Sequence, residues 1–578
     1  MSAPNSASKK KVVERVPVRE TPLEGIHPVL DRVYRNRGVK DPKELDYSLT
    51  NLLHPAGLAN LDDAVQIIFD AVQADALILI AGDYDADGAT SCALAYLALK
   101  AFGARCVSYA CPDRVRFGYG LSEKFVNYLS TTQPDVLITV DNGISSIAGV
   151  KLAKEYGITV VVTDHHLPGD SLPEADAIVN PRLPKDQFES KNLAGVGVIF
   201  YVLSTLKTRL AEANWFADEG IKVPVMADYL DLVALGTIAD VVPLDRNNRI
   251  LVAQGLRRIN SENCRVGIRG LLESDRRTIG KISSEDLAFS AGPRLNAAGR
   301  LDDIRYGVKC LTSNDRSEVF GLLEKIENFN QRRRDQEHKM ATQAMSQVER
   351  LENNLDVSKY SNCLVNQDWH SGIVGLIASR VREHTGRPTI VFAPDNDGNL
   401  RGSGRSVWNV NIRDAIADVS NLNPQLVVQF GGHAMAAGLT IAEESFEEFS
   451  DRFEDVIARY QEHQPAEDRI LTDGEIESLD LDTAEAIRNG GPWGQAFETP
   501  LFDGRFEIVQ YAVVKEIHLK MTVRSLKHSK TVDAIFFRYF QTHHQPPDLS
   551  TYTMIYRLEV NEFRGRKKPQ LIVQQLSQ

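Results

Sequence analysis

Apolar residues in the first half of the chain occur in short continuous runs, separated by amphipathic stretches of ten or more residues. Strands are expected over residues 76–82, 105–112, 135–143, 158–166 and 175–181. A run without polar alternation indicates a strand buried on both faces, and the helices between the runs can supply that cover. The pattern therefore predicts an α/β domain with a parallel sheet between about residues 75 and 245.

A long helix is predicted over residues 313–352, where there is no proline and Gly321 is the only glycine. Apolar residues recur at helical spacing in both halves of this stretch, namely Val319, Leu322, Leu323, Ile326 and Phe329, then Met340, Ala344, Met345, Val348 and Leu351. Such a helix would be about 60 Å long at 1.5 Å per residue. The middle, Arg332 to His338, is polar all round, so we expect a solvated section that bridges two domains.

Two further regions follow the predicted helix. Residues 360–462 again have α/β character, whereas residues 468–578 alternate in short runs typical of a small antiparallel barrel. We therefore expect an N-terminal segment that is partly disordered, a first α/β domain, a connecting helix, a second α/β domain and a C-terminal barrel. The expected boundaries are 1–45, 46–312, 313–353, 354–465 and 466–578.

Composition narrows the class of protein. Hydrophobic residues make up 43% of the chain and charged residues 25%, and no apolar run reaches the ~18 residues that a membrane span needs. The N-terminus lacks the apolar segment of a secretory signal. The six cysteines form no C-x-x-C pair, which argues against a zinc ribbon or a disulfide framework and favours the cytoplasm. The net charge of −12 excludes an overall basic coat but allows a local basic groove.

Three carboxylates interrupt the apolar run 77–99, at Asp83, Asp85 and Asp87. The letters DYDADG match the start of a calcium-binding EF-hand loop. Position twelve of that loop would be Leu94, where a bidentate glutamate is required, and the preceding segment is expected to be a strand rather than a helix. An EF-hand is therefore excluded.

The ends of the other predicted strands also carry acidic and imidazole groups. Asp141 follows one strand, and Asp164, His165 and His166 follow the next. Ligands of an open parallel sheet lie beyond the carboxyl ends of its strands, so these side chains should meet at one edge. Divalent cations would relieve their repulsion, and aspartate with histidine but no cysteine suits manganese or magnesium. Asp240, after an apolar stretch, could add a bridging carboxylate.

These motifs resemble those of a known superfamily. GDYDADGATS, VDNG, TDHH and GTIADVVPL are similar to the four successive motifs of the DHH phosphoesterases. SAGPRLNAAGRLDD, HSGIVGLIASR and FGGHAMAAGLT narrow the resemblance to the RecJ branch, a family of single-strand-specific 5′→3′ exonucleases. The likeness covers roughly residues 50 to 575. It implies a DHH domain, a DHH-associated domain and an oligonucleotide-binding (OB-like) barrel, in that order.

The resemblance implies a centre of two Mn²⁺ or Mg²⁺ ions and assigns its ligands. The ligands fall on Asp85, Asp87, Asp141, His165 and Asp240, with Asp87 and Asp141 bridging. Asp83 stands where relatives often carry histidine and is a further metal candidate. Asp164 and His166 flank a ligand, and we expect them to orient His165 or to touch the phosphate.

The resemblance also implies residues that contact the substrate. Arg114 and Arg294 are expected to hold the 5′-terminal phosphate, with Arg300 as a weaker candidate. His433, after two glycines, is expected to point at the scissile phosphate. Further candidates along the path of the strand are His370, Ser371, Arg401, Ser403, Arg405 and Ser406.

The C-terminal region interleaves aromatic and basic residues, which fits the stacking of bases over a basic track. The residues are Lys515, His518, Lys520, Arg524, Phe536, Phe537 and Arg538, and most of the phenylalanines are expected in the barrel core. A channel between this barrel and the long helix would admit one strand and exclude a duplex.

The resemblance implies an exonuclease that releases 5′-mononucleotides by attack of a water held between two cations, in DNA recombination and repair. It further implies a cytoplasmic, monomeric enzyme that works with single-strand-binding protein and a RecQ-type helicase and does not contact a membrane. One alternative is a phosphoesterase for short oligonucleotides or nucleotides. Another is an inactive relative that acts as a replication scaffold, although every expected ligand position carries aspartate or histidine.

Overall fold

The first domain is built on a parallel sheet, as the apolar runs predict. The structure is a computed structural model that describes residues 11–113, 116–118, 120–354, 360–395, 398–463 and 469–578. The five strands of the sheet are β2 (Ile78–Ala81), β3 (Val107–Ala110), β4 (Val136–Val140), β5 (Thr159–Thr163) and β6 (Ala177–Val179). Apart from parts of β3 and one residue of β5 they are buried, which explains why their sequences do not alternate.

The order of these strands creates a preferred ligand site. Neighbours follow the order β3-β2-β4-β5-β6, and every pair is parallel. The chain therefore adds β3 next to one edge of β2 and then adds β4, β5 and β6 in order from the other edge of β2. Connections leave a crevice where the order reverses, between β2 and β4, beyond the carboxyl ends of the strands.

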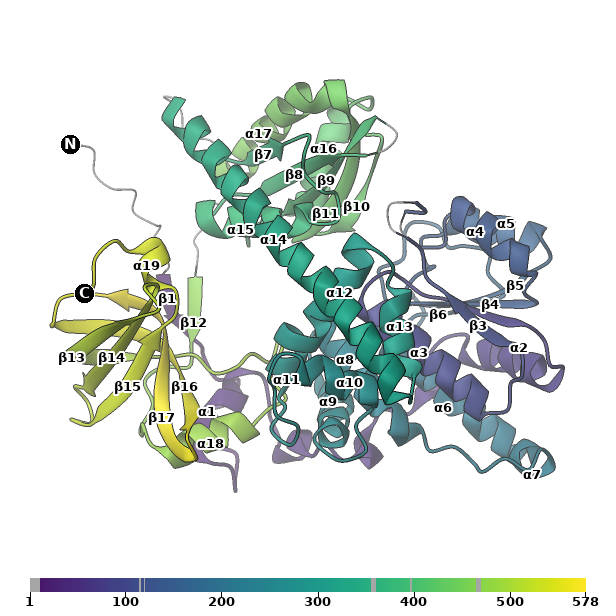
Figure 1. Cartoon of the computed structure of the whole chain (residues 1–578), viewed down its shortest axis with the longest axis horizontal. Coiled ribbons are helices and arrows are strands. Elements are labelled where there is room, and N and C mark those ends of the chain that lie inside the picture. The colour runs from purple at the N-terminus through teal and green to yellow at the C-terminus, as the bar shows by residue number, and fades with distance from the viewer. Residues whose placement is uncertain (1–10, 114–115, 119, 355–359, 396–397, 464–468) are drawn as a thin grey trace.

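Helices cover this sheet and extend the domain (Figure 1). They are α2 (Leu61–Gln73), α3 (Ala86–Ala101), α4 (Glu123–Leu129), α5 (Ile147–Glu155), α6 (Gly195–Glu212), α7 (Trp215–Asp218), α8 (Leu230–Ala239), α9 (Arg246–Ile259), α10 (Val266–Glu273), α11 (Ser284–Asp286), the π-helical turn Leu287–Ala291, α12 (Gly292–Leu301) and α13 (Arg305–Thr312). Short 3₁₀ turns lie at Ser130–Thr132 and Met226–Tyr229. Buried α3, α6 and α8 pack on one another beside the sheet.

The predicted long helix is present as α14 (Arg316–Asn354), 39 residues in one piece. Its first half belongs to the core of the first domain through Val319 and Ile326, and its second half joins a separate core through Ala344 and Val348. Figure 1 shows it running diagonally between the two domains.

The middle section, Arg332 to His338, is largely exposed, as expected, but one side of it is not. Asn330 is buried, and Glu337 is only 8% exposed because it accepts hydrogen bonds from Arg333 and from Arg380 of the second domain. An ion pair to a neighbouring helix thus buries one polar face of the section that we expected to lie in water.

The second domain has a mixed sheet of five strands in the order β10-β11-β9-β8-β7. These are β7 (Asn362–Val365), β8 (Thr389–Pro394), β9 (Asn399–Arg405), β10 (Gln429–His433) and β11 (Ala436–Ala442), covered by α15 (Val374–Thr385), α16 (Ile412–Leu422) and α17 (Phe446–His463), with a 3₁₀ turn at Glu443–Ser445. Only β7 and β8 pair in parallel. β10 and β11 form a hairpin whose first strand is largely exposed.

The C-terminal region forms the expected barrel. Its strands are β13 (Phe502–Val514), β14 (His518–Ser525), β15 (Thr531–Phe536), β16 (Thr551–Phe563) and β17 (Arg566–Ser577), closed in the order β13-β14-β15-β17-β16. α18 (Leu481–Asn489) packs against β16, and α19 (Tyr539–Thr542) follows β15. Phe502, Phe506 and Tyr556 fill the interior.

The N-terminal segment joins the barrel to the first domain. It contains β1 (Lys11–Glu14), α1 (Pro28–Asn36) and 3₁₀ turns at Pro42–Leu45, Leu49–Asn51 and Pro55–Gly57. β1 pairs in parallel with β12 (Arg469–Thr472), the strand that enters the barrel region. The Arg37 guanidinium forms a fully buried ion pair with Asp473 (2.7 Å). In the described residues no helix combines the length and apolar character that would let it cross a membrane.

Candidate metal centre

The first acidic motif turns directly from a strand into a helix. β2 ends at Ala81, and Asp85 caps α3 because its side chain accepts a hydrogen bond from the Gly88 amide (3.0 Å). Asp83 and Asp87 are buried, at 3% and 1% exposure. A helix N-terminus favours negative charge, so this turn can hold carboxylates that the bare sequence would force apart.

Asp87 is fixed by the start of another helix. The amides of Gly195 and Val196, at the N-terminus of α6, donate to its two carboxylate oxygens at 2.6 and 3.0 Å. Gly195 and Gly236 make this contact possible, because a Cβ at Gly195 would lie 2.5 Å from the Asp141 Cβ and one at Gly236 would lie 2.8 Å from Asp87 Oδ1. The predictions from sequence did not include this role of α6; the letters AGVG ahead of an apolar helix are the available signal.

The next ligands leave the neighbouring strands. Asp141 follows β4 with a left-handed backbone (φ 62°), and His165 follows β5. Asp240 caps the C-terminal end of α8, where the helix dipole disfavours a carboxylate, and Val241 behind it has φ 61°. A β-branched residue in that region is strained, and strain of this kind concentrates at functional sites.

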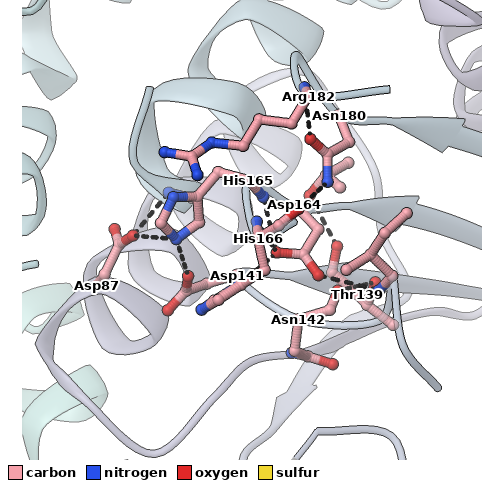
Figure 2. Close-up of polar contacts among 12 residues, drawn as sticks. Asp87, Thr139, Asp141, Asn142, Asp164, His165, His166, Asn180 and Arg182 are labelled. Atoms are coloured by element: carbon pink, nitrogen blue, oxygen red, sulfur yellow. Dashed lines mark hydrogen bonds and ion pairs between the residues drawn. The ribbon is translucent and has the colours of Figure 1, made fainter. Parts of the chain in front are cut away.

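These side chains converge on one point, and Figure 2 shows three of them, Asp87, Asp141 and His165, facing one another. His165 Nε2 lies 3.1 Å from Asp141 Oδ1, 3.5 Å from Asp240 Oδ2 and 4.0 Å from Asp87 Oδ2. In each of two further sets of side chains, the possible ligand atoms lie within 4.8 Å of one another. One set is Asp83, Asp85 and Asp141, and the other is Asp141, Asp164, His165 and His166. The structure thus brings together all the side chains assigned to the metal centre from the sequence.

The electrostatics of this cluster favour a positive charge near the carboxylates. Burial, and then the charge of Asp85, raise the pKa of Asp87 to about 7. Burial and the charge of Asp87 likewise raise the pKa values of Asp141 and Asp240 well above their usual range. Burial, and then the charge of His166, lower the pKa of His165 to about 3, so its imidazole is neutral at pH 7.

The donor set fits a divalent cation. Among the described residues, neither ring nitrogen of His165 nor Asp141 Oδ1 forms a hydrogen bond, although all three atoms are buried. Buried polar atoms without a partner are rare, and a cation between the imidazole and the carboxylates would satisfy these three atoms. Carboxylate and imidazole ligands of this kind suit Mn²⁺ and Mg²⁺.

Asp164 organises the neighbouring loop. It accepts hydrogen bonds from the His165 and His166 amides, from His166 Nδ1 (2.7 Å) and from the Ile144 amide. Burial alone would raise the pKa of Asp164, but the hydrogen bond and charge of His166 lower it to about 2. Burial alone would lower the pKa of His166, yet Asp164 raises it to about 9. His166 is therefore an imidazolium at the edge of the cluster.

Arg182 is a second cation at this edge, and the predictions from sequence did not include it. Its amide bonds to Asn180 Oδ1 and its Nε donates to the Lys191 carbonyl (3.1 Å), while its charge lowers the pKa of Asp240. Figure 2 shows the guanidinium beside the His165 ring. The available signal was its position just after β6, another strand that ends at the same edge.

His433 faces the cluster from the second domain. It ends β10 and is exposed, and its pKa is lowered, first by burial and then by the positive charges of His166 and Arg182. These interactions place the hairpin β10–β11 opposite the metal centre. Arg114 lies outside the described residues.

The expectation that Arg294 holds the terminal phosphate does not fit the structure. Its side chain is 3% exposed, and its guanidinium donates to Glu327 (2.8 Å), Asp275 (3.1 Å) and the Ser290 carbonyl. Every nitrogen of the group is therefore already paired with protein. Arg294 connects α12 to α14 instead of presenting a cation to a ligand.

Four of the remaining candidates of the second domain, His370, Ser371, Ser403 and Arg405, lie near the start of α15. Gly372 donates its amide to His370 Nδ1 and its carbonyl accepts from Arg300 (2.9 Å), which joins the two domains. Arg405 Nη1 donates to Ser403 Oγ. A Cβ at Gly375 would lie 3.0 Å from both of those side chains. Ser371 immediately precedes Gly372, Arg401 pairs with Asp395, and Ser406 is buried.

The barrel candidates divide between core and surface. Phe536 packs against the core, whereas Phe537 is 51% exposed and meets the His518 ring edge-on at 5.3 Å. His518 Nδ1 accepts from the Arg538 amide, and Arg524 pairs with Glu507 (2.9 Å). Lys515 and Lys520 are both exposed.

Comparisons with known proteins bear on every domain. The family model "DHH family, N-terminal domain" matches residues 77–237, "DHHA1 domain" matches 357–459 and "RecJ OB domain" matches 472–575. The chain is 45% identical to the single-stranded-DNA-specific exonuclease RecJ of Dickeya dadantii, over 98% of both chains. It is 42% identical to the RecJ of Escherichia coli, over 94% of this chain and 95% of that one.

A solved structure is also similar over most of the chain. The crystal structure of RecJ from Thermus thermophilus in complex with Mn²⁺ has a TM-score of 0.79 and 28% sequence identity, and the match covers 96% of this chain and 76% of that chain.

Proposed function

The chain belongs to the RecJ family of single-stranded-DNA-specific exonucleases, and from that premise we propose how its residues divide the work. It is a metal-dependent 5′→3′ exonuclease that hydrolyses single-stranded DNA to 5′-mononucleotides, in recombination and repair. The observation that carries this function is the meeting of buried carboxylates and a neutral imidazole at one sheet edge.

We propose that Asp85, Asp87, Asp141, His165 and Asp240 hold Mn²⁺ or Mg²⁺, with Asp83 close enough to take part. Divalent cations supply Lewis-acid activation of water and stabilise the charge that builds up on the phosphate. The raised pKa values of the carboxylates support this assignment. Burial and mutual repulsion favour their protonated forms, and a nearby cation is what keeps such groups charged at neutral pH.

We propose that the cations of the protein hold the scissile phosphate. His166, kept protonated by Asp164, and Arg182, whose charge reaches Asp240, would donate to its non-bridging oxygens. His433 would contact the same phosphate from the second domain. Donors fixed before the substrate arrives stabilise developing charge without reorganising in the reaction.

Other substrate contacts are proposed at the start of α15 and in the barrel. His370, Ser371 and Arg405 would line the path of the strand, and the exposed ring of Phe537 would stack on a base. The channel that admits one strand stays a prediction. We further propose a cytoplasmic monomer that acts with single-strand-binding protein and a RecQ-type helicase, and we retain the domain boundaries predicted from the sequence.

Digestion of end-labelled DNA tests the function. Single strands and duplexes, with and without a 5′-phosphate, are incubated in manganese, magnesium or chelator. We expect mononucleotides from the 5′ end of single strands only, and only with a cation. Cleavage in chelator, or equal degradation of duplex, would contradict the proposal. A strand-length series separates the enzyme from a phosphoesterase for short oligonucleotides, which would favour the shortest strands.

A further inference from the structure

A short turn between β9 and α16 holds a tryptophan out into solvent. Val407 and Val410 form the ends of the turn, where the Val410 amide donates to the Val407 carbonyl (3.2 Å), and both side chains are buried. Trp408 occupies one of the two central positions and is 88% exposed. The other tryptophans of the chain are buried or half-buried, and they are Trp215, Trp369 and Trp493. The ring of Trp408 is thus displayed on an anchored backbone instead of being packed into a core.

The segments on both sides of this turn are tied to the tip of the hairpin β10–β11. The Ser406 amide donates to the Met435 carbonyl (3.0 Å), and the Ile412 amide donates to the Ala434 carbonyl (2.9 Å). Ala434 and Met435 directly follow His433, the residue that faces the metal centre from the second domain. The turn and the catalytic edge of the second domain are therefore parts of one hydrogen-bonded unit.

The position of Trp408 suits contact with the substrate close to the metal centre. Two residues of chain on each side of one hydrogen bond separate its backbone from that of His433, which limits the distance to about 20 Å. Arg413, in the first turn of α16, carries an exposed guanidinium that pairs with Asp414 (3.7 Å). Burial lowers the pKa of His433, and the positive charge of Arg413 adds to this effect, so Arg413 also lies near His433. An exposed ring and a guanidinium together are the groups that hold bases and backbone of a single strand.

We propose that Trp408 stacks on a base of the substrate strand, within a few nucleotides of the scissile phosphate, and so holds the 5′ end at the metal centre. The inference rests on the proposed function, because it concerns the same substrate, and it adds a base contact to the phosphate contact of His433. Stacking tolerates any sequence, since every base has an aromatic face. A ring held on a fixed turn also loses little freedom when a base binds to it.

The experiment removes each partner of the stack in turn. The substrates are 5′-phosphorylated single strands, either intact or with one abasic site at each of about the first six positions. The variants are Trp408→Ala and Trp408→Phe. Affinity is measured by fluorescence anisotropy in chelator, so that no strand is cut, and KM and kcat are measured on intact strands in manganese.

The matched control is Tyr156→Ala. Tyr156 is also a half-exposed aromatic residue, and it ends α5, which leads into the start of β5. Because parallel strands all begin at the edge opposite to their carboxyl ends, this ring lies away from the metal centre. Melting temperatures verify that the variants are folded, which the exposure of both side chains leads us to expect.

We expect Trp408→Ala to weaken binding of the intact strand about tenfold and to raise KM by a similar factor, with kcat within about twofold of the wild-type value. An abasic site at the stacked position should weaken binding to the wild type by about the same factor. At that position Trp408→Ala should cause no further loss, because the ring no longer has a base to contact. Trp408→Phe should keep most of the affinity, and Tyr156→Ala should keep all of it.

Tryptophan fluorescence provides an independent measurement. Since Trp408 is the exposed tryptophan of the four, acrylamide should quench its emission in the free protein, and bound DNA should protect it. Trp408→Phe should abolish this protection while it keeps the affinity. A purely structural role of the side chain would not produce that combination.

Two outcomes overturn the inference. One is an unchanged affinity and KM in Trp408→Ala, and the other is a loss that adds to the abasic loss at every position. Digestion of intact strands by the wild-type enzyme is scored separately. Absence of 5′-mononucleotides there contradicts the proposed function, whereas an active wild type together with either of the two outcomes contradicts only the role of Trp408.

Discussion

The parallel sheet of the first domain and the mixed sheet of the second present opposite kinds of groups to each other. The first buries carboxylates at its edge, with Asp87 and Asp141 almost inaccessible. The second presents an exposed, glycine-rich hairpin that ends in His433. Metal ligands must be held at fixed positions around a cation, and the ends of parallel strands provide such a rigid frame. A substrate that must bind and then be released can be contacted by an exposed strand from a separate domain.

The largest effect should come from the buried side. Replacing Asp141 with asparagine removes a charged ligand while keeping its size, so exonuclease activity should fall by about 10³-fold or more. Release of labelled 5′-mononucleotides in manganese measures the loss. Binding of single strands should persist. If Asp141→Asn retains even a tenth of the wild-type rate, the first sheet does not hold the metal, and the second the substrate, in the way described.

Loss of the exposed group should matter less. In His433→Ala we expect a decrease in kcat of about 10–10²-fold, because one of several positive or hydrogen-bonding groups around the phosphate is removed. Steady-state kinetics on single strands measure it. The variant should bind Mn²⁺ with wild-type affinity, whereas Asp141→Asn should not. Weaker Mn²⁺ binding in His433→Ala would mean that the second domain helps to build the centre.

The pH dependence of metal binding should belong to the first domain alone. The pKa of Asp87 is raised to about 7, so below this pH a proton competes with the cation for the carboxylate. Affinity for Mn²⁺ should therefore fall by about tenfold or more for each pH unit below 7, because Asp141 and Asp240 also have raised pKa values, and protons should be released on binding. Calorimetry at several pH values in two buffers of different ionisation enthalpy tests this. His433→Ala should reproduce the wild-type curve.

The smallest effect concerns stability without metal. The pKa of Asp240 is raised in the folded protein, so the folded state binds the proton more tightly than the unfolded chain does. Stability of the metal-free protein should then decrease as pH rises from about 4 through the raised pKa values. At pH 8 in chelator, Asp240→Asn should increase the melting temperature by about 2–4 °C. His433→Ala should leave the melting temperature within about 1 °C of the wild-type value. An increase in His433→Ala as large as that in Asp240→Asn would mean that the stabilisation does not come from removal of the Asp240 carboxylate.

The fold was predictable where local patterns determine it. Continuous apolar runs indicated the buried parallel strands, and strand ends of one sheet share an edge, so Asp85, Asp141 and His165 could be placed together without coordinates. Arg182 is also at this edge but sits in an ordinary loop, with no periodicity or cluster to distinguish it.

The failures share a cause, which is pairing between distant segments. Arg294 sits among small residues, as a phosphate-binding arginine could, but its partners Asp275 and Glu327 lie 19 and 33 residues away. The burial of Glu337 in the otherwise exposed middle of α14 has the same origin, because Arg380, which binds Glu337, is 43 residues further on. No local pattern reports which carboxylate a buried arginine will meet.

The pairing of β1 with β12 has a consequence for synthesis of the chain. Arg15, just after β1, forms an ion pair with Glu498, 483 residues further along, and among the described residues β1 pairs with the strand that leads into the barrel. On the ribosome, the first strand emerges long before its neighbour exists. An unpaired strand edge is prone to associate with other chains. The pairing of β1 with β12 can therefore form only after the chain has been translated past residue 472.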